Sequence, residues 1–121
     1  MSGGLLLVEE ALLARDPTAP ALAERLRLRQ VPLEALAVTP HHRPLLAALA
    51  RTAADPAQTW AVVTDPAWIL PATTAGLAGV VLIGAAVPPG DHGVVVAEAD
   101  SLADTTRVMI PRRGGCWHDP R

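Results

Sequence analysis

The 121-residue sequence has no lysine, no phenylalanine and no tyrosine, and it contains one cysteine and three tryptophans. Without Phe and Tyr, the core has to be built from Leu, Val, Ile and Ala, and Ala buries little apolar area per residue. We therefore expect modest stability, or a homo-oligomer or protein partner that adds buried surface. The lone Cys116 cannot form an internal disulfide, which suits a reducing compartment and predicts a cytoplasmic protein.

Two further absences exclude classes of partner. The ten arginines are dispersed and the formal net charge is −2, so the chain lacks the basic footprint of a nucleic-acid-binding protein. The apolar run near the N-terminus has no basic residue before it and is broken by Glu9 and Glu10, which argues against a signal peptide. The longest apolar stretch, 77–87, is too short to cross a bilayer, which needs about 20 residues. We expect neither nucleic acid nor membrane as a partner.

Short apolar runs alternate along the chain with amphipathic or Ala-rich segments. The runs predict strands at 5–8, 36–38, 60–63, 79–83 and 93–97. The segments between and after them predict helices at 19–29, from Thr39-Pro40 to Asp55-Pro56, at 67–75 and at 101–109. Strands that are apolar throughout are typical of a parallel sheet covered on both faces. The sequence thus predicts an α/β fold over 1–110, with three layers and a doubly wound, mostly parallel five-stranded sheet, and an irregular tail at 111–121.

Proline, glycine and serine mark the ends of these elements. Pro44 falls in the first turn of its helix, where proline is tolerated, whereas Pro71 should kink or delay the next helix. Gly76 is expected to end that helix. Ser101 is expected to cap the last one.

The N-terminal third of the chain carries two segments that resemble motifs of one enzyme superfamily. Residues 5–13, LLLVEEALL, are an apolar strand followed by two acids. They resemble the first motif of the haloacid dehalogenase (HAD) superfamily, a strand followed by Asp-x-Asp-Gly-Thr-Leu. In that resemblance Val8 stands at the nucleophile position and Glu10 at the second aspartate. The helix at 19–29 and the strand leading to Thr39 are similar to the second motif, with Thr39 as the matching hydroxyl.

The middle of the chain extends the resemblance. Residues 40–58 resemble the helix that precedes the last HAD motif. WAVVTD at 60–65 and AGL at 75–77, followed by the apolar run 79–83, resemble the Gly-Asp-x-x-x-Asp motif and the turn into the next strand. Asp65 is kept, whereas the second acid is replaced near Trp68. The resemblance implies a capless, Rossmann-like HAD domain with its site at the strand ends.

The same resemblance implies that the catalytic set is degenerate. HAD phosphoryl transfer uses an aspartate nucleophile, a second aspartate as acid and base, a cationic side chain and acids that hold Mg²⁺. Val8 cannot attack a phosphate, and Arg43 is the candidate for the cationic role because lysine is absent. Glu10 and Asp65 are the candidate ligands of a weak Mg²⁺ site. The alternative is that Glu9 and Glu10 lie in a solvated loop and that Asp65 caps the segment after it.

Two hypotheses of function follow from these residues. The preferred one is a non-catalytic HAD-like binding or structural module, without a cofactor, that works through protein–protein contacts. Trp68 and Trp117 are its candidate interface residues, since tryptophan is enriched where partners meet. The alternative is a divergent Mg²⁺-dependent phosphatase or hydrolase rebuilt around Glu10, Thr39 and Asp65.

A third hypothesis and a rival fold remain open. Thr39, the N-terminus of the following helix and Arg43 could bind an anion, which would make the chain a sensor of phospho-ligands. The acids at 9–10 and Asp65 are also similar to those of a response-regulator receiver domain. That family has a longer segment after the third strand and a lysine after the fifth, so we place it second.

The histidines and the tail give no trusted site. His41 and His42 are neighbours at a helix start and should point in different directions. Together with His92, Cys116 and His118 they match no zinc-ligand spacing. The segment 116–118 has no assigned role, although a tryptophan there suggests docking on this chain or another.

Overall fold

The computed structural model of the chain describes residues 3–36 and 39–105. Within them lies a five-stranded sheet in the order β2-β1-β3-β4-β5, and all its pairings are parallel. The strands are β1 (Leu6–Glu9), β2 (Leu33–Leu36), β3 (Trp60–Val63), β4 (Gly79–Ile83) and β5 (Val95–Ala99). The helices are α1 (Glu10–Arg15), α2 (Ala19–Leu28), α3 (His42–Thr52) and α4 (Ile69–Ala75), with 3₁₀ turns η1 (Pro56–Gln58), η2 (Pro66–Trp68) and η3 (Leu102–Asp104).

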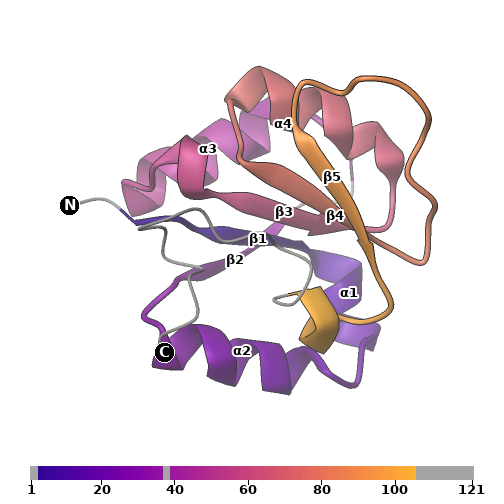
Figure 1. Cartoon of the computed structure of the whole chain (residues 1–121). Helices are drawn as coiled ribbons and strands as arrows, with labels where there is room; N and C mark the ends of the chain where they lie inside the picture. Colours follow the sequence, from indigo (N-terminus) through magenta and orange to yellow (C-terminus); the bar gives the residue numbers. More distant parts are fainter. Residues whose placement is uncertain (1–2, 37–38, 106–121) are drawn as a thin grey trace, which may run out of the picture.

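Helices cover both faces of the sheet, so the domain has three layers (Figure 1). Helices α3 and α4 pack on one face, which we name the α3–α4 face, and α1, α2 and η3 pack on the other, the α1–α2 face. The predicted α/β class, three layers and doubly wound parallel sheet are therefore confirmed. The predicted tail, 111–121, lies outside the described residues. None of the helices in 3–36 and 39–105 is long and apolar enough to span a bilayer.

The alternation of side chains along each central strand builds two separate apolar clusters. Leu5 and Leu7 pack toward the α3–α4 face, whereas Leu6 and Val8 pack toward the α1–α2 face. All four are fully buried. A strand covered on both faces needs an apolar residue at every position, which explains the continuous apolar runs in the sequence.

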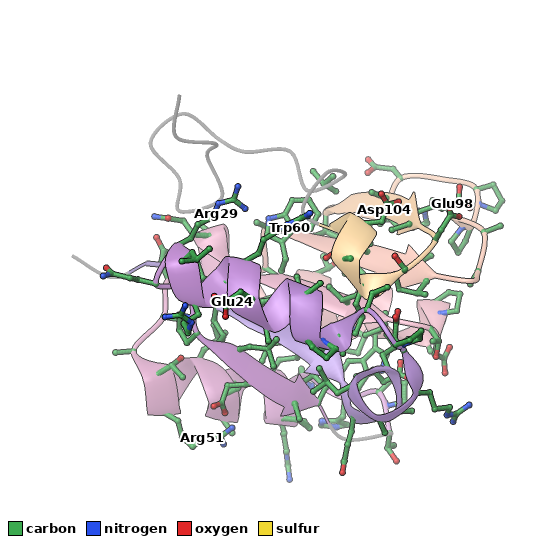
Figure 2. The ribbon with its side chains drawn as sticks, turned by 90° about the horizontal axis from the view of Figure 1, so that it is seen from below. Glu24, Arg29, Arg51, Trp60, Glu98 and Asp104 are labelled. Carbon is green, nitrogen blue, oxygen red and sulfur yellow. The ribbon has the colours of Figure 1, made fainter. Side chains whose placement is uncertain are left out.

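Trp60 belongs to the cluster on the α1–α2 face and packs over its register partner on β4, Gly79. A Cβ atom at Gly79 would collide with the Trp60 ring, so a side chain at this position requires the ring to shift. Figure 2 views the molecule from the α1–α2 face and labels Trp60. Its ring is a core element of the sheet rather than a surface contact, since it is only 3% exposed.

The central strands match the prediction more closely than the edge strands do. The bounds of β3 and β4 are as predicted, and β1 spans Leu6–Glu9 rather than 5–8. At one edge, β2 begins at Leu33, earlier than the predicted residue 36, and residues 37–38 lie outside the described part. At the other edge, β5 spans Val95–Ala99 rather than 93–97. Both edge strands contain exposed residues, which need not be apolar. The apolar runs in the sequence therefore do not coincide with the ends of these two strands.

The helices differ from the prediction at several points. Helix α3 lies inside its predicted limits, and the predicted helix at 101–109 begins as the turn η3, with residues 106–109 outside the described part. The pattern does not predict α1, whose six residues bury only Leu12. Helix α4 begins after η2, so Pro71 falls in its first turn and the helix is delayed, one of the two predicted outcomes. Gly76 ends α4 with a φ of 78°, as predicted. The predicted cap at Ser101 is wrong, because its side chain makes no capping bond to η3.

Candidate functional site

The carboxyl ends of β1 and β3 open into a depression of about 490 Å³. The chain continues from β1 to β2 on one side of the sheet, whereas β3, β4 and β5 extend the other side. In doubly wound sheets ligands bind outside the carboxyl ends of the strands, where the strand order reverses in this way. The depression is lined by residues between Glu9 and Thr18, by Thr64 after β3, and by Asp100 and Ser101 after β5.

Glu9, the last residue of β1, is the buried acid of this depression. It is 6% exposed. Its Oε2 accepts a hydrogen bond of 2.8 Å from the backbone N–H of Thr64, and its Oε1 accepts one of 2.8 Å from the Thr64 hydroxyl. The prediction of a solvated loop is wrong for Glu9, because β1 runs one residue further and the end of β3 supplies two donors. The carboxylate thus bridges the ends of two neighbouring strands.

Asp16, in the loop between α1 and α2, forms the second polar centre. Its Oδ1 accepts bonds from the backbone N–H and the hydroxyl of Thr18, at 2.7 and 2.6 Å, and its Oδ2 accepts one of 2.8 Å from the N–H of Leu102. Partial burial raises the pKa of Asp16, but the hydrogen bonds outweigh burial and leave the pKa below its ordinary value. The hydroxyl of Thr18 also accepts a bond from the N–H of Ala103. Asp16 and Thr18 therefore fasten η3 to the start of α2.

The remaining polar groups of the lining differ from these two acids. Arg15 and Asp100 are exposed and Ser101 is half-buried. Within 3–36 and 39–105, no hydrogen bond or ion pair engages these three side chains. Ala11, Leu12 and Pro17 add an apolar part to the same lining. The depression therefore has polar groups already engaged at Glu9 and Asp16, unengaged charges at its mouth and an apolar wall.

The residues predicted as a degenerate catalytic set do not meet as a metal centre. Val8 is fully buried in the cluster of the α1–α2 face. Glu10 is exposed at the start of α1, and Asp65 caps η2 by accepting a 2.9 Å bond from the N–H of Ala67. No three His, Cys, Asp or Glu side chains of the described residues are grouped so that they could hold a metal ion.

The predicted anion site at the start of α3 is also organised differently. His41 caps this helix: its Nδ1 accepts a 3.0 Å bond from the backbone N–H of Arg43. Thr39 and Arg43 are exposed and do not line the depression. The rings of His41 and His42 stack with centroids 4.4 Å apart, so the prediction that they point in different directions is wrong.

The two tryptophans predicted as interface residues have different outcomes. Trp68 is fully buried in the cluster of the α3–α4 face, so this side chain offers no surface to a partner and the prediction is corrected. It lies in η2, where the 3₁₀ turn directs it between α3, α4 and the sheet. Trp117, Cys116 and His118 lie outside the described residues.

Sequence reasoning missed Glu9 and Asp16, the two hydrogen-bonded acids among the three that line the depression. Glu9 directly follows an apolar run, and that position could have identified it as the end of the central strand. Asp16 sits in Asp16-Pro17-Thr18, a local pattern in which the Asp side chain bonds to the N–H two residues on, although its bond to Leu102 has no sequence signal. No protein-family model and no curated protein matches this sequence. Function is therefore inferred from the chain's own residues.

Proposed function

We propose that the chain is a non-catalytic α/β binding module, a degenerate HAD-like domain that keeps the sheet and has lost phosphoryl transfer. The observation that carries the proposal is the engagement of the acid at the end of β1. Glu9 is buried, and Thr64 donates one hydrogen bond to each of its carboxylate oxygens. This carboxylate therefore serves as a structural tie between the ends of β1 and β3.

The other positions of the resemblance support the same proposal. Val8, at the nucleophile position, is aliphatic and buried, so neither its chemistry nor its location serves attack on a phosphate. Asp65 is engaged as the cap of η2. The sequence contains no lysine for the cationic role. The nucleophile position therefore has the wrong chemistry, and Asp65 has a structural role.

A divergent Mg²⁺-dependent hydrolase is the second candidate, and one contact favours it. Glu9, at the end of β1, accepts a hydrogen bond from Thr64, the residue directly before Asp65. Glu9 and Asp65 therefore lie at the ends of two neighbouring strands, β1 and β3. The donor set does not fit the metal well, because no third His, Cys, Asp or Glu of the described residues joins them in a metal-holding group. Calorimetric titration with MgCl₂ tests this candidate, and binding that is lost in Glu9→Gln, Glu10→Gln or Asp65→Asn would support it.

A phosphatase assay tests the main proposal. The full chain, incubated with p-nitrophenyl phosphate and Mg²⁺, is expected to release no more nitrophenol than buffer does. Glu9→Gln and Asp65→Asn serve as the site variants, and Glu98→Gln, an exposed acid on β5, serves as the matched control. Turnover by the unmodified chain and by Glu98→Gln, absent from both site variants, would refute the non-catalytic assignment.

The proposal includes a protein partner or a second copy in the cytoplasm. A partner is supported by large apolar side chains that are exposed on three helices, namely Leu28 on α2, Leu46 on α3 and Leu70 on α4. The lone cysteine suits a reducing compartment. Size-exclusion chromatography with light scattering tests self-association, and a monomer at all concentrations would remove the homo-oligomer.

A further inference from the structure

We propose that the depression at the ends of β1 and β3 binds a small organic ammonium ion with a short apolar body, and that Glu9 is the counter-ion of the ammonium group. The proposal rests on the proposed function in one respect, namely that the depression serves binding rather than catalysis. It adds the chemical class of the ligand.

The first step concerns the partners of the buried acid. A buried carboxylate is costly unless hydrogen bonds and an opposite charge compensate it. Glu9 has the hydrogen bonds, both from Thr64, but no cationic side chain of the described residues forms an ion pair with it. A carboxylate oxygen can accept more than one bond. An ammonium ion in the depression supplies both the remaining donors and the missing positive charge.

The second step is the sign of the whole lining. Three carboxylates, those of Glu9, Asp16 and Asp100, line the depression against one guanidinium, that of Arg15. Arg15 is exposed, whereas Glu9 is buried, so the deeper charge is negative. Such a lining repels a phosphate dianion and attracts a cation. The ligand class is thus opposite in charge to the substrate of a phosphatase.

The third step distinguishes an organic cation from a metal ion. The volume of about 490 Å³ is that of a small-molecule site, far larger than a metal ion needs. Its wall includes Ala11, Leu12 and Pro17, which offer apolar contact and no ligand atoms from their side chains. The described acids also form no metal-holding group. A primary ammonium on a short hydrocarbon chain satisfies both the charge and the wall.

Titration of the isotope-labelled full chain with hexylammonium chloride, followed by NMR, tests the proposal. We expect saturable shifts at Glu9, Leu12 and Thr64. Hexanol has the same body without the charge and hexanoate has the opposite charge, so both should bind at least about tenfold more weakly. Sodium phosphate and MgCl₂ should leave these signals unshifted.

Matched variants locate the ammonium group. Glu9→Gln keeps an acceptor for Thr64 but removes the charge, and it should weaken hexylammonium binding about tenfold or more. Asp100→Asn, at the exposed mouth, should weaken it only about two- to threefold. Glu98→Gln changes the same charge on β5, outside the lining, and should have no effect; Figure 2 labels this side chain.

Four outcomes would overturn the proposal: no saturable binding of hexylammonium, equal binding of hexanol, tighter binding of hexanoate or phosphate, or full affinity in Glu9→Gln. If Glu9→Gln fails to fold, as judged by its amide spectrum, the ligand comparison and Asp100→Asn still decide. Failure here is separable from failure of the proposed function. Phosphatase turnover would refute the non-catalytic assignment whatever binds, whereas an inert chain that ignores ammonium ions would refute only the ligand class.

Discussion

The two faces of the sheet are held in different ways. On the α3–α4 face, Trp68, Leu45 and Leu49 fill the space between the helices and the sheet with fully or nearly fully buried apolar side chains. On the α1–α2 face, apolar packing is joined by bonds that connect distant parts of the chain. Asp16 and Thr18 accept bonds from the backbone of η3, and η3 in turn accepts one from Arg25.

The difference explains why the depression lies where it does. On the α3–α4 face, interdigitated apolar side chains fill the space between the helices and the sheet. The α1–α2 face has a short first helix that buries only Leu12, so the polar loop after it and the turn after β5 can surround the strand ends. The closed face supplies the rigid support, and the polar face supplies the shape of the candidate site.

Trp68→Ala should give the largest effect and tests whether the α3–α4 face depends on packing. Truncating a fully buried tryptophan removes its burial and leaves a cavity, so the free energy of unfolding should fall by about 3–5 kcal/mol. Urea denaturation measures the change. The control is Leu70→Ala, on the same face but 73% exposed, which should change stability by less than about 0.5 kcal/mol. Equal losses in the two variants would contradict the packing of this face.

Gly79→Ala tests the packing component of the α1–α2 face and should have the next largest effect. The new Cβ would collide with the buried ring of Trp60, which has to move, so we expect a loss of about 1–3 kcal/mol. Gly3→Ala is the control, because a Cβ there meets no atom within 4 Å. If Gly79→Ala unfolds at the same temperature as the unmodified chain, the Trp60 ring can shift without loss of packing, which would contradict this prediction.

Asp16→Asn tests the polar component and should cost about 1–2 kcal/mol at pH 7, since charged acceptor bonds to Thr18 and Leu102 are weakened. The pKa of Asp16 is below its ordinary value in the folded chain, so the unfolded chain binds the proton more readily. The contribution is therefore complete above the unfolded pKa, about 3.9, and is lost as the pH falls through the folded pKa.

Denaturation at several pH values measures that dependence. The difference in stability between the unmodified chain and Asp16→Asn should be constant from pH 7 to about 5 and should shrink below about 4. Asp91→Asn is the control, because among the described residues the Asp91 side chain accepts a bond only from Gly93, in its own loop. A difference that grows with falling pH would mean that the bonds to Asp16 do not stabilise its charged form.

The sequence predicts the centre of the fold better than its edges for a physical reason. β3 and β4 are covered on both faces, so burial requires an apolar run as long as the strand, and their bounds are correct. β2 and β5 have exposed positions, so their residues are chosen less strictly and their ends carry no pattern. Helix α1 is not predicted because it buries one residue, Leu12, and a single buried leucine gives no helical periodicity in the sequence.

The candidate site is less predictable than the fold, because its contacts join residues far apart in the chain. Asp65 was expected either to cap the next turn or to hold a metal ion, and the cap is present because the bond partner, Ala67, is local. The partners of Glu9 and Asp16 are 55 and 86 positions away, at Thr64 and Leu102. No spacing rule reaches that far, so only the folded chain brings these groups together.

The position of β1 has a consequence for synthesis of the chain. β1 leaves the ribosome before β2 and β3, yet it pairs with β2 on one side and with β3 on the other. The apolar residues of β1 cannot pair with β3 until the chain has been synthesised as far as Val63. Parallel pairing between strands so far apart in the sequence forms slowly. A nascent chain shorter than this exposes Leu5–Val8 to other chains and to chaperones. Arrested fragments that end before β3 should therefore aggregate, whereas fragments that include β4 should begin to protect this segment.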